Sequence, residues 1–219
     1  MIQYNIMKTI VAATKNKHKI VEIEAITSQF GMNIVPRDEA GVPDIEIPET
    51  GKTFEENSYI KAHEIMKLSG QITIADDSGL VVDCIEGAPG VYSARFATFP
   101  GIWPDEKDED EADSDDRDNN SKLIRLIKDV PYEQRTAHFV SVITMVFPDG
   151  ETLVARGEVH GHLVLEERGK GGFGYDPLFV PLGYDRTFGE LPAELKNSIS
   201  HRANALVSLK EKLEKLSID

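Results

Sequence analysis

The chain has 219 residues, 40% of them hydrophobic, so it can bury a substantial core, and a single domain is expected. Its 24 basic and 38 acidic residues give a formal net charge of −14, which disfavours binding to extended nucleic acid, because that binding depends on Lys and Arg neutralising phosphates. Cys84 is the single cysteine, no apolar run is long enough to cross a bilayer, and no signal-peptide pattern is present, so we expect a cytoplasmic protein without disulfides or membrane partners.

The first predicted elements are a strand and two helices. Thr9–Ala13 is short, apolar and β-prone, which predicts a buried strand. Asn16 suits the N-cap of a helix over residues 17–30, whose apolar positions recur at helical spacing. The sequence Thr-Phe-Glu-Glu that begins at Thr53 fits a capping box, and it predicts a second helix that ends at Gly70.

Asp76-Asp77-Ser78-Gly79 is predicted to form a tight turn between strands at residues 72–75 and 80–84, with Gly79 permitting the bend. Two neighbouring carboxylates at a strand end can bind Mg²⁺ or orient a water molecule. The alternative is an Asx-type turn, in which both side chains bond to nearby backbone. The turn by itself leaves both interpretations open.

Residues 103–118 are rich in Asp, Glu and Lys. We interpret them as a solvated loop inserted into the domain, because like charges repel and the segment has few apolar residues. The alternative is a metal or partner site, but nothing in the segment fixes its carboxylates in a coordination geometry.

The rest of the chain continues the mixture of strands and helices. Residues 138–147 and 152–159 flank Pro148-Asp149-Gly150, which is a hairpin signal. A short strand is predicted at residues 178–180 and a charged helix at 200–216. This order predicts an α/β fold with a mixed β-sheet flanked by helices, rather than a purely parallel sheet.

A basic cluster at residues 14–19 lies where the first strand meets the first helix, an arrangement that suits phosphate because free backbone N–H groups point outward there. The alternative is a solvated basic helix start. Positive charge at a helix N-terminus opposes the helix dipole, however, and a bound triphosphate would relieve that cost.

The glycine-rich stretch at residues 169–177 matches neither the P-loop nor the dinucleotide fingerprint. Phe173 in this stretch is suited to stack on a base. The alternative is a flexible loop whose aromatic rings, Tyr175 in particular, pack into the core. Asn57 and Lys61, one helical turn apart, are predicted either to face a cleft together or, for Lys61, to be exposed to solvent.

These clusters, together with Lys196 and Ser200-His201-Arg202 further on, resemble in their order the inosine triphosphate pyrophosphatase family, also called Ham1-like. The resemblance extends over residues 9–209 apart from the acidic segment. It implies an α/β fold whose two lobes surround a central nucleotide-binding cleft. It also implies a homodimer that uses Mg²⁺ to hydrolyse ITP, dITP and XTP to the monophosphate and pyrophosphate, which removes deaminated purines from the nucleotide pool.

The same resemblance implies the roles of individual residues. Asp77 is expected to be the proton acceptor and, with Glu49, to hold Mg²⁺. Lys15 and His18 stand where relatives often carry glycine. The residues expected to contact the substrate are Thr14, Lys15, Asn16, Lys17, His18, Lys19, Ser78, Phe173, Gly174, Tyr175, Asp176, Lys196, His201 and Arg202.

Arg202 and its neighbours are expected to read the 6-oxo edge of the purine, because a keto oxygen accepts hydrogen bonds whereas adenine presents an amino group. Two other functions stay open. One is a phosphohydrolase of the same scaffold that acts on another nucleotide, and the other is a non-catalytic nucleotide sensor.

Overall fold

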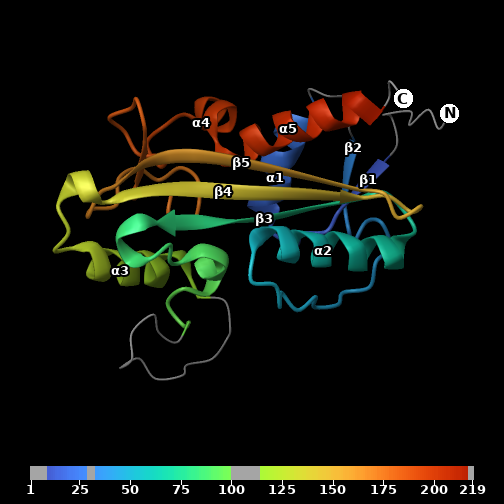
Figure 1. Cartoon of the computed structure of the whole chain (residues 1–219), viewed down its shortest axis with the longest axis horizontal. Helices are drawn as coiled ribbons and strands as arrows, with labels where there is room; N and C mark the ends of the chain where they lie inside the picture. Colours follow the sequence, from blue (N-terminus) through green and yellow to red (C-terminus); the bar gives the residue numbers. More distant parts are fainter. Residues whose placement is uncertain (1–8, 29–32, 100–113, 217–219) are drawn as a thin grey trace. The chain divides into compact units, whose positions relative to one another are not determined.

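The computed structural model describes residues 9–28, 33–99 and 114–216 (Figure 1). Within these ranges six strands form one sheet in the order β2-β1-β3-β4-β5-β6. The strands are β1 Thr9–Ala12, β2 Asn33–Pro36, β3 Thr73–Val82, β4 Thr136–Val146, β5 Thr152–Leu163 and β6 Phe179–Pro181. β1 runs parallel to β2 and β3, whereas β5 and β6 are antiparallel, so the expected α/β fold with a mixed sheet is confirmed.

Five α-helices accompany the sheet in the described ranges: α1 Lys17–Thr27, α2 Phe54–Ser69, α3 Asp116–Ile127, α4 Ala193–Ile199 and α5 His201–Leu216. The chain divides into two compact units. Unit 1 contains residues 1–77, 141–158 and 199–219, and unit 2 contains residues 78–140 and 159–198. None of the helices in the described part of the chain is long and apolar enough to span a membrane.

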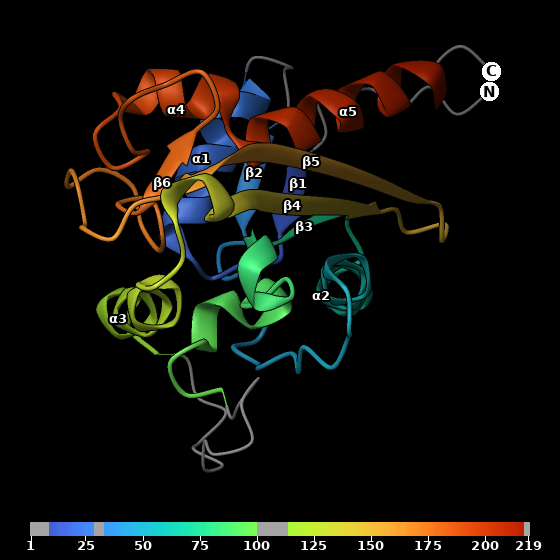
Figure 2. The same ribbon diagram turned by 60° about the vertical axis from the view of Figure 1, so that its left-hand side comes forward.

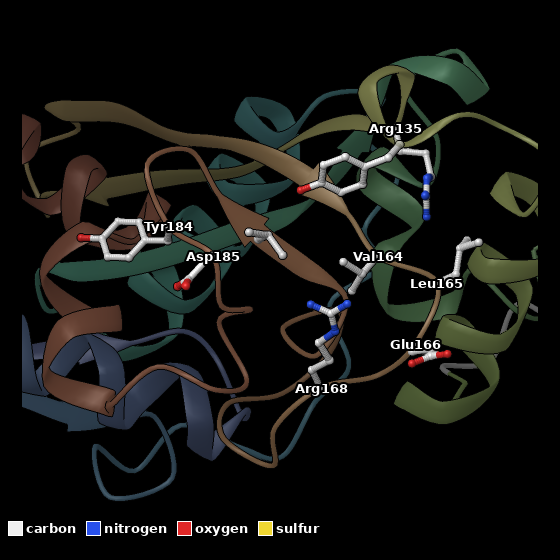
Figure 3. Close-up of a pocket in the computed structure, with 9 residues that line it drawn as sticks. Arg135, Val164, Leu165, Glu166, Arg168, Tyr184 and Asp185 are labelled. Atoms are coloured by element: carbon white, nitrogen blue, oxygen red, sulfur yellow. The ribbon is translucent and has the colours of Figure 1, made fainter.

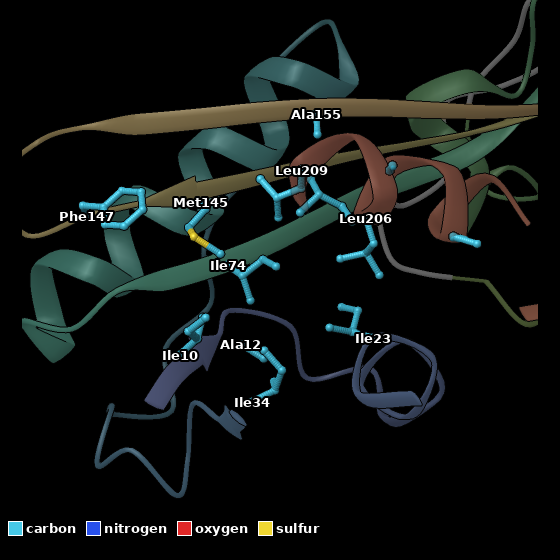
Figure 4. Packing of buried hydrophobic residues seen from close by; sticks show 13 residues of the cluster. Ile10, Ala12, Ile23, Ile34, Ile74, Met145, Phe147, Ala155, Leu206 and Leu209 are labelled. Atoms are coloured by element: carbon cyan, nitrogen blue, oxygen red, sulfur yellow. The ribbon is translucent and has the colours of Figure 1, made fainter. Parts of the chain in front are cut away.

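Unit 1 has an apolar layer on each face of its part of the sheet. On one face, Ile10 and Ile74 belong to a cluster completed by side chains of α1 and α5 (Figure 4). On the other face, Val11 and Ala75 pack with buried side chains of α2. Adjacent residues of β1 and of β3 therefore serve opposite layers, as the alternation of a strand requires.

Gly157 of β5 lets α5 approach the sheet closely. A Cβ atom at this position would lie 2.1 Å from the backbone nitrogen of Ala205, so no larger residue fits without moving the helix. The side chains of β5 that flank this contact include Ala155, which belongs to the same apolar cluster as α5.

Unit 2 has an aromatic centre next to β6, which pairs with β5. Figure 2 labels both strands in a ribbon view. The ring centroids of Phe139 and Phe179 lie 4.8 Å apart, and those of Phe179 and Phe188 lie 5.2 Å apart. All three side chains are buried, so they fix the chain around β6.

Most elements with a local sequence signal form as predicted. α2 begins with the capping box, in which Thr53 Oγ1 accepts from Glu56 N and the Glu56 carboxylate accepts from Thr53 N, and it ends at Gly70 with φ 64°. Asn16 Oδ1 accepts from Lys19 N at the start of α1. The hairpin between β4 and β5 is closed by Gly150 N donating to Phe147 O.

The predicted turn at Asp76–Gly79 is wrong, because β3 continues through these four residues. Both Asp side chains bind distant side chains rather than nearby backbone, so neither stabilises a turn. The Asx-turn alternative fails for the same reason. Adjacent strand residues point to opposite faces, and this separates the two carboxylates.

The acidic segment is only partly described, because residues 100–113 lie outside the described ranges. The loop interpretation is wrong for its last residues, which begin α3. Asp115 is the N-cap, and its Oδ1 accepts from Asp118 N at 2.8 Å. Acidic residues in a first turn complement the helix dipole, so the charges that suggested a loop stabilise a helix start here.

Candidate functional site

The basic cluster lies in unit 1 between β1 and α1. Asn16 N donates to Thr14 Oγ1 at 3.1 Å, which shapes the turn before the helix. Lys15 forms an exposed ion pair with Asp44, whereas Lys17 is exposed in the first turn. The side chain of His18 lies outside the described part of the structure. Of the described side chains in this cluster, Lys19 is the one that reaches the buried carboxylates of β3.

Asp76 of β3 is a buried acceptor. Lys19 Nζ lies 3.0 Å and Arg202 Nη2 3.1 Å from Asp76 Oδ2, and Ser141 Oγ donates to Oδ1. Burial acts to raise the pKa of Asp76, but Arg202, Lys19 and the Ser141 hydroxyl together hold that pKa well below its ordinary value. Asp76 is therefore an ionised anchor for two cations.

Arg202, which was expected to read the purine base, is fully buried. One terminal nitrogen pairs with Glu22 and the other with Asp76, so both are committed to carboxylates of unit 1. Glu22 was not predicted as a site residue. The signal that could have found it is its position three residues after Lys19, which places both on one side of α1. His201, the first residue of α5, is buried as well.

Asp77 points to the opposite side of β3 from Asp76. Lys61 Nζ lies 2.6 Å from Asp77 Oδ1 and 3.0 Å from Glu49 Oε1. The second oxygen of Asp77, Oδ2, is buried and has no hydrogen-bond partner among the described residues. Burial raises the pKa of Asp77 above its ordinary value, against the lowering effect of Lys61 and Lys19. Such a carboxylate is a stronger base than an exposed one.

The Lys61 side chain is 11% exposed, so the alternative of a solvent-exposed lysine is wrong. Burial acts to lower its pKa, but Asp77 and Glu49 raise that pKa above its ordinary value. The ammonium group is therefore charged, and it bridges the two carboxylates that the sequence analysis assigned to metal binding.

The loop that carries Glu49 is fixed to the start of α2. Gly51 N donates to Asn57 Oδ1 at 2.8 Å, and Lys52 N donates to Glu56 Oε2 at 2.6 Å. A Cβ atom at Gly51 would lie 2.6 Å from Asn57 Oδ1, so glycine is required for this contact. Asn57 therefore positions the Glu49 loop.

Glu49 and Asp77 suit a divalent cation. One ammonium nitrogen already contacts an oxygen of each, so the two carboxylates lie within reach of a single positive centre. No group of three or more His, Cys, Asp or Glu side chains in the described ranges could hold a metal ion. Two carboxylates alone match a cation that keeps waters or ligand oxygens in its remaining positions.

The glycine-rich loop forms a second cluster, in unit 2. Lys196 Nζ lies 2.6 Å from Asp176 Oδ2, and both side chains are almost fully buried. The same ammonium lies 5.0 Å from the ring centroid of Phe173, whose backbone nitrogen donates to Asp176. Gly172 has φ +76°, and a Cβ there would overlap Asp176 Oδ2, so only glycine permits this loop.

Tyr175 belongs to the core of unit 2, as the alternative interpretation of the loop had it. It is 4% exposed, and its hydroxyl donates to Ser93 O at 2.9 Å. The expected contact of its side chain with a substrate stays a prediction. Ser78, in the unit 2 part of β3, is half-buried.

Two residues of α3 hold the loop, and sequence analysis missed both. Gly174 N donates to Asp116 Oδ2 at 2.7 Å, and Asn120 Nδ2 donates to Gly174 O at 3.2 Å. Their spacing of four residues, directly after the Asp115 cap, is the sequence signal that could have identified them. The end of the acidic segment thus supports the glycine-rich loop.

A pocket of about 620 Å³ also lies in unit 2, lined by Arg135 and Arg168 among others (Figure 3). None of the predicted site residues lines it. The chemistry-bearing side chains form two clusters: Glu49, Lys61 and Asp77 in unit 1, and Phe173, Asp176 and Lys196 in unit 2. Lys19 is paired with Asp76 on the other side of β3.

Residues 10–212 match the family model described as Ham1 family. The chain is 44% identical over 214 residues to the dITP/XTP pyrophosphatase of Clostridium perfringens (strain 13 / Type A), covering 95% of this chain and 98% of the relative. It is 44% identical over 208 residues to the enzyme of the same name from Geobacter sulfurreducens, covering 94% and 97%.

Among solved structures, the Staphylococcus aureus Ham1 protein superposes with a TM-score of 0.77 at 37% identity, covering 95% of this chain and 100% of that one. Sequence and fold agree over nearly the whole length. The chain belongs to the Ham1 family.

Proposed function

We propose that the protein hydrolyses non-canonical purine nucleoside triphosphates, namely ITP, dITP and XTP, to the monophosphate and pyrophosphate. The observation that carries the proposal is the cluster of Glu49, Lys61 and Asp77, in which two carboxylates converge and one buried oxygen is left without a partner among the described residues. Relatives that carry the name dITP/XTP pyrophosphatase support the choice of substrate.

In the proposed reaction, Asp77 accepts a proton at Oδ2 from a water molecule that attacks the α-phosphorus, and pyrophosphate leaves. The raised pKa of Asp77, caused chiefly by burial, suits this role. Lys61 contacts Asp77, and the charge of Lys19 also acts to lower the pKa of Asp77. Both cations stabilise the negative charge that develops on the phosphates.

Glu49 and Asp77 are the residues that would hold Mg²⁺, whose oxygen preference matches this pair. When bound, the ion neutralises charge on the phosphate chain and polarises the phosphorus under attack. Asn57 contributes by fixing the loop that carries Glu49.

The second cluster is proposed to hold the nucleoside. Phe173 offers a ring face for stacking, and Asp176 and Lys196 offer an acceptor and donors that fix each other in place. The buried pair of Arg202 and Asp76 is proposed to position Lys19 rather than to touch the base, because Asp76 binds both cations.

The protein is further proposed to be a cytoplasmic homodimer that binds neither nucleic acid nor membranes. The net charge of −14 supports the absence of nucleic-acid binding. A non-catalytic sensor would release no product, and an enzyme for another nucleotide would prefer a different substrate. One assay therefore separates both alternatives from the proposed function.

The test is turnover of ITP, XTP, dUTP, GTP and ATP, measured as pyrophosphate released with Mg²⁺ and with EDTA. We expect release from ITP and XTP with Mg²⁺, slow turnover of ATP, and loss of activity in EDTA. Binding of ITP without release would identify a sensor, and preference for dUTP would identify a different substrate class.

A further inference from the structure

Lys61 holds the position where a bound cation would be expected. Its ammonium nitrogen lies 2.6 Å from Asp77 Oδ1 and 3.0 Å from Glu49 Oε1. We propose that Lys61 acts as an internal counter-cation that blocks this carboxylate pair until a triphosphate binds, so that metal and nucleotide load together. This inference rests on the proposed function, because it takes Glu49 and Asp77 as the metal ligands.

The charges explain why Lys61 must move. Glu49 and Asp77 carry two negative charges, and Lys61 cancels one of them inside a largely buried site. A dication placed between the same oxygens would lie within a few ångströms of the ammonium, where repulsion is strong at low dielectric. Metal binding without nucleotide therefore has to displace a buried charge that has no other carboxylate partner among the described residues.

A triphosphate removes this obstacle because it brings several negative oxygens to the site. The displaced ammonium then exchanges its carboxylate partners for phosphate oxygens and stays neutralised. Lys19 is not a substitute for Lys61, because its ammonium is paired with Asp76 on the other side of β3. Metal binding and nucleotide binding are thus coupled through one side chain. In such coupling each ligand raises the affinity of the protein for the other by the same factor.

The test is Mn²⁺ binding to the full-length protein without nucleotide, measured by electron paramagnetic resonance of free Mn²⁺. Lys61→Met should bind Mn²⁺ roughly 5- to 150-fold more tightly than the unaltered protein, the usual range for coupled sites. Lys67→Met is the matched control, because Lys67 lies on the same helix but pairs with Glu64 at the surface. It should bind Mn²⁺ like the unaltered protein.

A second variant, Glu49→Gln combined with Lys61→Met, should lose the increase in Mn²⁺ affinity. This loss would assign the increase to the carboxylate pair. Circular dichroism shows whether each variant is folded, and Lys61→Gln replaces Lys61→Met if the latter is not. Equal Mn²⁺ affinity of folded Lys61 variants and unaltered protein would overturn the proposal. Pyrophosphate release from ITP is scored separately on the unaltered protein. Tight Mn²⁺ binding by Lys61→Met together with no turnover by the unaltered protein would refute the proposed function and leave the counter-cation role standing.

Discussion

Replacing Asp77 with Asn is expected to lower kcat for ITP by about 10²- to 10⁴-fold, the range usual for loss of a general base. The amide keeps an oxygen that can accept from Lys61, but it puts an NH₂ group where Asp77 Oδ2 would accept the proton of the attacking water. The measurement is steady-state turnover with saturating Mg²⁺, together with the thermal unfolding temperature.

Asp129→Asn is the control for this experiment, because Asp129 is an exposed carboxylate outside both clusters. Its turnover should match that of the unaltered enzyme. An Asp77→Asn protein that keeps more than about half of the normal kcat would remove Asp77 from the mechanism.

Arg202→Met is expected to lower the free energy of unfolding by roughly 3–5 kcal/mol, the usual cost of breaking a buried ion pair by removing one partner. The substitution leaves the Glu22 and Asp76 carboxylates without the guanidinium that neutralises them. Urea unfolding of the variant and the unaltered protein measures the difference.

Glu22→Gln is the companion variant for Arg202. If the pair acts as a unit, the double variant should cost less than the sum of the two single variants. Unchanged stability of Arg202→Met, combined with a collapse of the ITP-over-ATP ratio, would contradict the buried-anchor assignment and restore Arg202 as a donor to the base.

Features with a local cause could be predicted from the sequence. The capping box at Thr53, the end of α2 at Gly70 and the hairpin at Gly150 each depend on residues within a few positions of one another. The strand β1 was predicted from its short, apolar, β-prone run, and the helix α5 from the charged sequence at residues 200–216.

Features that depend on distant partners could not be predicted. Arg202 and Glu22 are 180 positions apart, so no local pattern indicates that they form a buried pair. The Asp-Asp-Ser-Gly sequence suggested a turn, whereas the partners that bind the two Asp residues within β3, Arg202 and Lys61, come from elsewhere in the chain. The resemblance to the family assigned the catalytic role to Asp77, and the structure adds that Asp76 has different partners.

The most direct test of the proposed reaction is hydrolysis of ITP in water enriched in ¹⁸O, with the label located in the products by mass spectrometry. Attack of water at the α-phosphorus, with Asp77 as the base, predicts one ¹⁸O atom in inosine monophosphate and none in pyrophosphate. Label in the pyrophosphate, or release of inorganic phosphate in its place, would contradict the account.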